Sequence, residues 1–207
     1  PIILPEVGHG EEKKISKTTE SYIKAAEKIA ELKAETIVIS SPHSVMYSDY
    51  FHISPGDSAY GDMGNFRADE VSFNEIYDTE FVERITTLAW DKGQFPAGTL
   101  GERDKNLDHG TMIPLYFIRK KYHDFKLVRI GLSGLPFSMH YEMGQLIKKA
   151  SEDLDRKTVF IASGDLSHKM KEEGPYGFAE EGPKYDDMIM EVCGNADFIK
   201  LFDYCFI

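Results

Sequence analysis

The sequence predicts a three-layer α/β/α fold with a largely parallel central sheet. Segments with the period of an α-helix alternate with short β-rich segments along the chain of 207 residues. Residues 36–39 and 158–162 are continuous β-branched or apolar runs, which is typical of strands buried on both faces of a parallel sheet. Helices between such strands are expected in this fold class.

The first half of the chain contains one clear helix and then an irregular stretch. Residues 16–33 carry apolar side chains on one helical face and Glu and Lys on the other, so we expect a surface helix there, ahead of the first strand. Residues 47–77 are rich in turn residues such as Tyr60-Gly61 and Gly64. Only short strands are expected in this stretch, at residues 50–53 and 70–73.

The second half alternates helices and strands more regularly. Asp78 is placed to cap a helix with apolar residues at helical spacing, and a Gly/Pro-rich loop follows it. Thr111 is expected to cap a helix that runs to about residue 122, with Pro114 in its first turn, where the missing N–H costs nothing. The remaining predicted elements are a strand, a helix, a buried strand and a final helix, at residues 126–130, 138–154, 158–162 and from 182 onward.

Composition and charge narrow the function classes. The chain has 24 Lys and Arg against 35 Asp and Glu, a formal net charge of −11, which argues against general nucleic-acid binding because phosphate contacts need a basic face. No apolar run approaches the roughly 20 residues of a membrane span. Two cysteines, Cys193 and Cys205, are too few for a disulfide scaffold, so we expect a reducing, cytoplasmic setting.

Three histidines lie at junctions between predicted elements. His43 follows the first predicted strand, His168 follows the strand at residues 158–162, and His109 precedes a predicted helix. In α/β folds, ligands bind outside the carboxyl ends of the strands, so side chains delivered there can converge on one site. These positions single out the three histidines as candidate functional residues.

Local sequence leaves two interpretations for each histidine. His43, held in a tight turn after Pro42, is either a metal ligand or a loop histidine bonded to nearby carbonyls. His109 is either a general base at a helix N-terminus, where the dipole disfavours an imidazolium, or part of capping chemistry. Its neighbour Asp108 either fixes the imidazole tautomer or caps the turn. His168 is, on local grounds alone, equally well a solvated loop residue.

Several enzyme classes lack their signatures in this chain. The sequence has no Gly-x-Ser-x-Gly elbow for a serine hydrolase and no phosphate-loop or dinucleotide-binding glycine motif. It also has no Cys-x-x-Cys pair, which argues against zinc-finger and thiol-redox functions.

Four segments together match the motifs of one known family: they are Pro1-Ile-Ile-Leu-Pro5-Glu-Val-Gly8, Ser41-Pro-His43, Leu107-Asp-His-Gly-Thr111 with Pro114-Leu115, and Ser163-Gly-Asp-Leu-Ser-His168. With them the chain resembles the class III extradiol ring-cleaving dioxygenases of the LigB-like superfamily. The likeness covers nearly the whole chain and is greatest to the LigB-like proteins of the AmmeMemoRadiSam gene set, next to the Memo-like group.

The resemblance implies a set of site residues. It implies non-haem Fe(II), or another divalent metal, held by two His and one carboxylate, with His43 as one ligand and Glu191 as the nearest match to the carboxylate. It makes His109 and His168 the histidines that move protons, with Asp108 beside them. It also places Ser167 and Thr111 at the substrate pocket, although Memo-type proteins have a Cys at the position of Ser167.

The resemblance also implies boundaries and partners. The first metal ligand of the family is a His that would lie just upstream of Pro1, so residues 1–207 are expected to be a single LigB-like domain that lacks its N-terminal residues and either includes or lacks its C-terminal end. The expected function is Fe(II)-dependent meta cleavage of a catechol-type aromatic with dioxygen. A Memo-like metal- or partner-binding protein is the alternative, and a metal-assisted hydrolase is a weaker one. The dioxygenase and the Memo-like function are each compatible with a fused or associated domain of the same gene set and with a homo-oligomer. Nucleic-acid and membrane partners are not expected.

Overall fold

A computed structural model describes residues 1–203 of the chain. They divide into two compact units, one of residues Pro1–Ser163 and one that begins at Gly164. Compactness alone does not distinguish one domain from two, so the expected single domain over residues 1–207 stays a prediction. Cys193 is exposed, and Cys205 lies outside the described residues.

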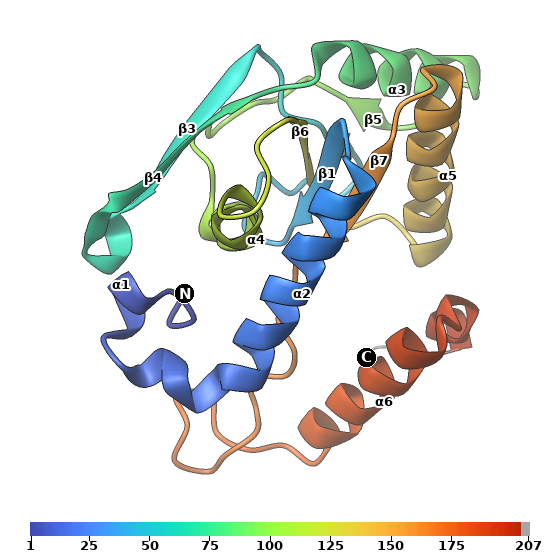
Figure 1. Ribbon diagram of the computed structural model, residues 1–207. Helices are drawn as coiled ribbons and strands as arrows, with labels where there is room; N and C mark the ends of the chain where they lie inside the picture. The colour runs from blue at the N-terminus through green and yellow to red at the C-terminus, as the bar shows by residue number, and fades with distance from the viewer. Residues whose placement is uncertain (204–207) are drawn as a thin grey trace. The chain divides into compact units, whose positions relative to one another are not determined.

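The first unit is built around a parallel sheet of three strands. Strand β1 (Thr36–Ser41) lies in the middle, with β6 (Lys126–Gly131) on one side and β7 (Thr158–Ala162) on the other (Figure 1). In this register Val38 is opposite both Val128 and Phe160. Every residue of β1 is buried, as its β-branched sequence predicts.

Helices cover both faces of this sheet. Alternate residues of β1 and β6, such as Ile37, Ile39 and Leu127, belong to a core shared with α2 (Ser16–Leu32) and α4 (His109–Arg119). The intervening residues, such as Val38, Val128 and Ile130, pack with the helices α3 (Thr79–Asp91) and α5 (Phe137–Asp153) (Figure 1). The predicted three-layer α/β/α architecture is therefore confirmed.

An antiparallel hairpin, β3 (Ser58–Met63) with β4 (Ala68–Ile76), lies beside this three-layer core. The turn residues Tyr60-Gly61 predicted an irregular stretch, and that prediction was wrong for residues 58–63. Alternate residues Ala59, Gly61 and Met63 are buried there, so one face of the strand packs on the core despite its weak strand propensity. Strand β4 of the hairpin lies beside α1 (Pro5–Gly8) (Figure 1).

Smaller elements complete the first unit. The two-residue strands β2 (Phe51–His52) and β5 (Ala97–Gly98) pair in parallel. Strand β2 lies where a short strand was predicted, whereas β5 lies in the predicted Gly/Pro-rich loop. Two 3₁₀ helices, η1 (Glu11–Ile15) and η2 (Gly64–Phe66), connect α1 to α2 and β3 to β4. Helix α3 begins after Asp78, whose Oδ1 accepts a hydrogen bond of 3.2 Å from the Phe81 N–H, as predicted for a cap.

Strand β7 is an open edge rather than the fully buried strand that its sequence predicts. The Lys157 carbonyl and the Ser163 N–H bond to β1, so the backbone groups of the even-numbered residues between them point away from it. Among residues 1–163 no strand pairs with that edge, and the Phe160 side chain is 51% exposed. The prediction failed because a continuous apolar run does not reveal whether a neighbouring strand is present.

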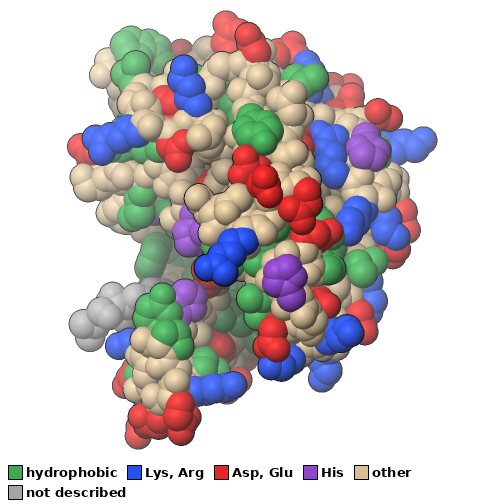
Figure 2. Space-filling view, turned by 90° about the vertical axis from the view of Figure 1, so that its left-hand side faces the viewer, with side chains coloured by type: hydrophobic (Ala, Val, Ile, Leu, Met, Phe, Trp, Pro, Cys, Tyr) green, Lys and Arg blue, Asp and Glu red, His purple; other side chains and the backbone are tan. Residues whose placement is uncertain are grey.

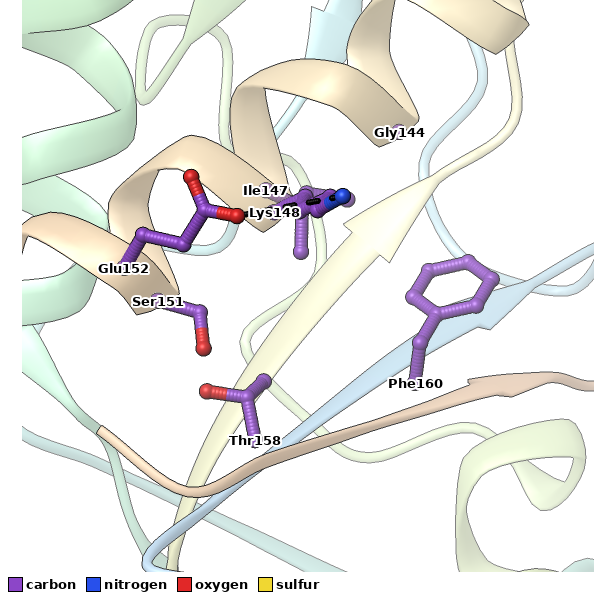
Figure 3. A pocket seen from close by; sticks show the side chains of 7 residues that line it. All are labelled: Gly144, Ile147, Lys148, Ser151, Glu152, Thr158 and Phe160. Carbon is purple, nitrogen blue, oxygen red and sulfur yellow. Dashed lines mark ion pairs between the residues drawn. The ribbon is translucent and has the colours of Figure 1, made fainter. Parts of the chain in front are cut away.

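A pocket of about 480 Å³ lies between β7 and α5 (Figure 3). Thr158 and Phe160 form its strand side, while Gly144 and Ser151 lie on its helix side. The apolar face of α5 packs toward α3 and the other strands, which leaves this side of β7 uncovered. Further helix residues lining the pocket are Ile147 and the ion pair of Lys148 with Glu152.

The second unit contains helix α6 (Glu181–Asn195) and the 3₁₀ helix η3 (Phe198–Asp203), after a loop closed by a bridge between Met170 and Phe178. Its helix lies where the sequence predicts one. Within residues 1–203 no helix is long and apolar enough to cross a membrane. On the face drawn in Figure 2, acidic and basic side chains are interspersed rather than gathered into a continuous basic patch.

Candidate functional site

Two of the predicted histidines lie against each other at the carboxyl end of β1. His43 follows this strand in a tight turn, and His109 is the first residue of α4. Their ring centroids are 3.9 Å apart, with an angle of 36° between the ring planes. The Phe66 ring meets His109 edge-on at 5.3 Å. The structure therefore brings a strand end, a helix start and the β3–β4 hairpin to one place.

These two rings lie in a polar pocket of about 510 Å³. The hairpin forms one wall with Tyr60 and Asp62, and the loop before α4 forms the other with Asp104 and Asn106. A mixture of imidazole, carboxylate, amide and aromatic side chains suits a small ligand with both an aromatic face and polar groups. The remaining lining residues are Gly61, Asn65, Phe66, Leu107, Asp108 and Met112.

Asp108 is the N-cap of α4. Its Oδ1 accepts hydrogen bonds from the Thr111 N–H at 3.0 Å and from the Ser41 hydroxyl at 2.5 Å, and its Oδ2 accepts one from the Thr111 hydroxyl at 2.9 Å. The prediction that Thr111 caps this helix was wrong. The helix begins at His109, so Thr111 lies in its first turn and donates its N–H and its hydroxyl to the cap residue Asp108. Thr111 is fully buried and does not line the pocket, so its predicted pocket role stays a prediction.

Two residues let α4 approach the end of β1. A Cβ on Gly110 would lie 2.5 Å from Ser41 Oγ and 3.2 Å from His43 Cδ2, so a larger residue would push the helix away. Pro114 lies inside the helix rather than in its first turn and cannot donate to the Gly110 carbonyl. The Ser163 hydroxyl donates to that carbonyl instead, at 2.7 Å. The start of α4 is thus fastened to the chain just after β7.

The Tyr60 hydroxyl is held at the rim of the pocket. It donates to Asp62 Oδ2 at 3.0 Å, while Asp62 Oδ1 accepts from the Gly64 N–H at 2.9 Å. The hydrogen bond to Asp62 raises the pKa of Tyr60 above its usual value near 10. Tyr60 therefore stays protonated, as a donor, at neutral pH.

A buried arginine lies behind the loop wall, and sequence reasoning missed it. Arg129 of β6 is 2% exposed and donates from Nε to the Ser54 hydroxyl at 2.8 Å, and from its two terminal nitrogens to the Asp104 and Asn106 carbonyls. Glu102 and Asp108 have carboxylate oxygens 3.7 and 3.9 Å from it. The signal in the sequence is a charged residue inside an otherwise apolar strand.

A histidine next to this arginine, His52 of β2, is also fully buried. His52 Nδ1 lies 3.0 Å from the Leu100 carbonyl oxygen, and Nε2 lies 3.4 Å from Glu102 Oε2 without forming a hydrogen bond. Glu102 thus faces both His52 and Arg129. This arrangement packs the loop before α4 onto β2 and β6.

Three other candidates belong to the second unit. The His168 side chain is 52% exposed, lies 3.7 Å from Asp165 and packs on Tyr176 with ring centroids 5.0 Å apart. Ser167 donates its N–H to Asp186 at 2.8 Å. Glu191 is an exposed residue of α6, 3.8 Å from Lys200. Their predicted roles in proton transfer, the pocket and metal binding stay predictions.

The family model described as the catalytic LigB subunit of aromatic ring-opening dioxygenase matches residues 1–204 of the chain. The chain belongs to the LigB family. Two curated relatives are similar to it. Protein CA_C1420 of Clostridium acetobutylicum is 40% identical over 198 residues, which cover 92% of this chain and 42% of that protein. A MEMO1 family protein of Methanobrevibacter smithii is 31% identical over 173 residues, covering 81% of this chain and 51% of that protein.

This LigB chain thus spans about half the length, or less, of the curated relatives it matches. Its membership confirms the predicted superfamily, and the MEMO1 relative supports the Memo-like placement within it. Both the ring-opening family and the Memo-like group are therefore represented among the proteins similar to this chain.

LigB-type dioxygenases are generally metal-dependent, so the side chains of this LigB chain that could act as metal ligands matter for its function. Within residues 1–203 no three or more His, Cys, Asp or Glu side chains are grouped so as to hold a metal ion. At the pocket, the imidazole of His43 packs on that of His109, and Asp108 is engaged as a helix cap. The described residues thus do not by themselves form the two-histidine, one-carboxylate centre that the resemblance implies.

Proposed function

We propose that this chain is the catalytic part of an aromatic ring-opening dioxygenase, which cleaves a catechol-type substrate beside its two hydroxyls with dioxygen. The observation that carries the proposal is the His43–His109 pair in a pocket that also holds an aromatic ring, Phe66. Fe(II) is the metal that the family resemblance favours, with His43 as its predicted ligand.

The chemistry of the pocket supports a substrate with ionisable hydroxyls. His109 lies at the N-terminus of α4, where the helix dipole favours the negative charge of a deprotonated diol. An imidazole at that place can accept a hydroxyl proton and return it to an oxygen of the product. The edge-on ring of Phe66 supplies an apolar surface on which an aromatic substrate can pack.

Oxygen uptake with a panel of catechols, measured on the complete gene product together with its iron content, tests this proposal. His109→Ala should abolish oxygen uptake while the metal content stays near that of the wild type, and His43→Ala should lower the metal content. His123→Ala, at an exposed histidine after α4, is the matched control and should change neither. Iron-loaded wild-type protein that consumes no oxygen with any catechol would contradict ring cleavage.

A Memo-like binding function is the second candidate. The 31% identical MEMO1 family protein of Methanobrevibacter smithii favours it. In that case the pocket would bind a metal or a partner without turnover. Three results together would support binding rather than catalysis. The wild type would retain metal that His43→Ala loses, it would take up no oxygen, and it would recover a protein encoded in the same gene set.

A further inference from the structure

Arg129 is a buried cation in a strand whose neighbouring residues are apolar. Leu127, Val128 and Ile130 on the same strand are buried in the core, and Arg129 is 2% exposed. A guanidinium taken out of water is costly unless its donors are satisfied, and an apolar side chain of similar size is often at least as stabilising. Packing alone therefore does not explain an arginine at this position.

The donors of Arg129 go to the chain segment that precedes α4. One terminal nitrogen donates to the Asn106 carbonyl and the other donates to the Asp104 carbonyl at 2.9 Å. The carboxylates of Glu102 and Asp108 lie within 3.9 Å of the same guanidinium. Four residues at alternate positions, 102 to 108, thus face one side chain.

This segment forms no helix or strand. Its Leu107 N–H donates to the Tyr60 carbonyl of β3 at 2.8 Å, and local side chains and Arg129 also fix its path. The Asn106 N–H donates to the Asp104 carboxylate at 2.9 Å, and the Asp104 N–H donates to the Glu102 carboxylate at 3.1 Å. These two N–H groups are therefore satisfied within the segment, while the carbonyls of Asp104 and Asn106 accept from Arg129. Removing the guanidinium would leave both carbonyls without these hydrogen bonds.

The same segment is a wall of the His43–His109 pocket. Asp104 and Asn106 line the pocket, and Asp108 ends the segment as the cap of α4, directly before His109. A shift in the segment is thus transmitted to the first turn of the helix that presents His109.

We propose that Arg129 is a positioning residue for this pocket: it fixes residues 102–108 so that α4 starts in register with β1 and His109 lies against His43. The role of Arg129 in turnover rests on the proposed function, whereas its role in the geometry of the pocket does not. Arginine is suited to the task because its planar fork reaches the two carbonyls and Ser54 at once, whereas lysine offers a single point of charge.

The test compares Arg129→Lys with Arg119→Lys in the full chain. Arg119 also makes a forked contact, with Glu75, but it lies at the far end of α4 and does not line the pocket. The first readout is the NMR signals of the His43 and His109 rings, together with amide hydrogen exchange over residues 102–108. Arg129→Lys should shift both ring signals and speed exchange in that segment, and Arg119→Lys should leave both unchanged.

The second readout is kinetic, on whichever catechol the wild type consumes. Displacement of a catalytic group by about 1 Å can cost about 10²-fold in rate, so Arg129→Lys should lower kcat by that order with a smaller change in KM. Arg119→Lys should keep both constants. If the wild type consumes no catechol, the proposed ring cleavage fails while the ring signals still decide the geometric role.

Ser54→Ala keeps the proposal testable if Arg129→Lys does not fold. It removes one of the three acceptors of Arg129 and leaves the charge in place. The His109 signal should then move in the same direction by a smaller amount. Either of two results would overturn the proposal. One is a folded Arg129→Lys with wild-type ring signals and wild-type exchange over residues 102–108. The other is an unmoved His109 signal in Ser54→Ala.

Discussion

Asp108 joins three segments through one carboxylate. It accepts from the N–H and hydroxyl of Thr111 in α4 and from the hydroxyl of Ser41 at the end of β1. Asp108→Ala should therefore lower the free energy of unfolding by about 0.5–2 kcal/mol, the usual cost of a lost cap, or more because Ser41 loses its acceptor as well. Asp108→Asn keeps an acceptor oxygen for the Thr111 N–H and should cost less.

Urea unfolding of the two Asp108 variants beside Asp124→Ala measures this difference. Asp124 is exposed and should be close to neutral when replaced. Equal stabilities of Asp108→Ala and the wild type would show that the cap is dispensable.

At the residue scale, the sequence predicted where candidate functional residues lie in the fold better than it predicted which side chains contact one another. His43 and His109 were found because polar residues after parallel strands meet at one edge, and the fold brings their rings together. The role of Arg129 was not predicted, because its hydrogen-bond partners lie 23 to 75 positions away in the sequence, at Asn106, Asp104 and Ser54. Such a network follows from the tertiary fold and has no local signature.

At the element scale, two glycines should respond oppositely to alanine. A Cβ on Gly61 of β3 would lie 2.6 Å from Leu107 Cβ and 2.9 Å from its carbonyl oxygen, so Gly61→Ala should separate the hairpin from the loop before α4 and cost about 1–3 kcal/mol. Gly144 lies inside α5 with nothing within 4 Å of an added Cβ. Gly144→Ala should stabilise by about 0.5–1 kcal/mol.

Thermal unfolding of these two glycine variants in one buffer provides the measurement, and each variant serves as the control for the other. A stable Gly61→Ala with wild-type ring signals for His109 would mean that the hairpin does not press on the pocket wall.

A second prediction at this scale concerns the contact between α1 and α4. The Tyr116 hydroxyl donates to Glu6 at 2.9 Å, and burial together with this carboxylate raises the pKa of Tyr116 above its ordinary value of 10. Because the folded chain holds the phenolic proton more tightly than the unfolded chain, this contribution to stability is fully present below pH 10. It is lost as the pH rises from 10 through the folded-state pKa.

The alkaline loss should therefore be smaller in Tyr116→Phe than in the wild type. Denaturant midpoints at about pH 9 and about pH 11 for both proteins isolate Tyr116, because the other tyrosines titrate in both. Parallel midpoint changes in the two proteins would contradict a raised pKa at this position.

Among the elements, those with a strong sequence pattern were predicted, whereas strand β4 (Ala68–Ile76) was predicted only over residues 70–73. Helices α2, α3 and α5 carry apolar residues at helical spacing, strands β1 and β6 are short β-rich runs, and each lies where the sequence predicted it. Strand β3 was missed, because its alternation depends on Gly61 and Ala59, which have little preference for strands. The start of α4 was misplaced because Asp108 and Thr111 are both good caps, and the tertiary contact of Asp108 with Ser41 has no signal in the local sequence.

At the scale of the whole molecule, the two units differ in how they are held together. Of the buried hydrophobic residues in the described part of the chain, Val192 alone lies beyond Ser163. The first unit therefore contains nearly all of the apolar core, in two clusters on either side of the sheet. That distribution follows from the predicted layers, whereas the division at Gly164 has no counterpart in composition.

Because no strand among residues 1–163 pairs with the outer side of β7, we expect this edge to promote assembly of the chain with itself. Its outward backbone groups at Thr158, Phe160 and Ala162 form a template for any extended strand, and the Phe160 ring offers an apolar contact. Phe160→Lys should keep the protein monomeric at concentrations where the wild type forms larger species, as light scattering would show, whereas Trp90→Lys, at an exposed helical position, should not. Wild-type protein that stays monomeric at high concentration would contradict this prediction. A strand that is ordinary in the middle of a sheet thus becomes, at its edge, a starting point for aggregation.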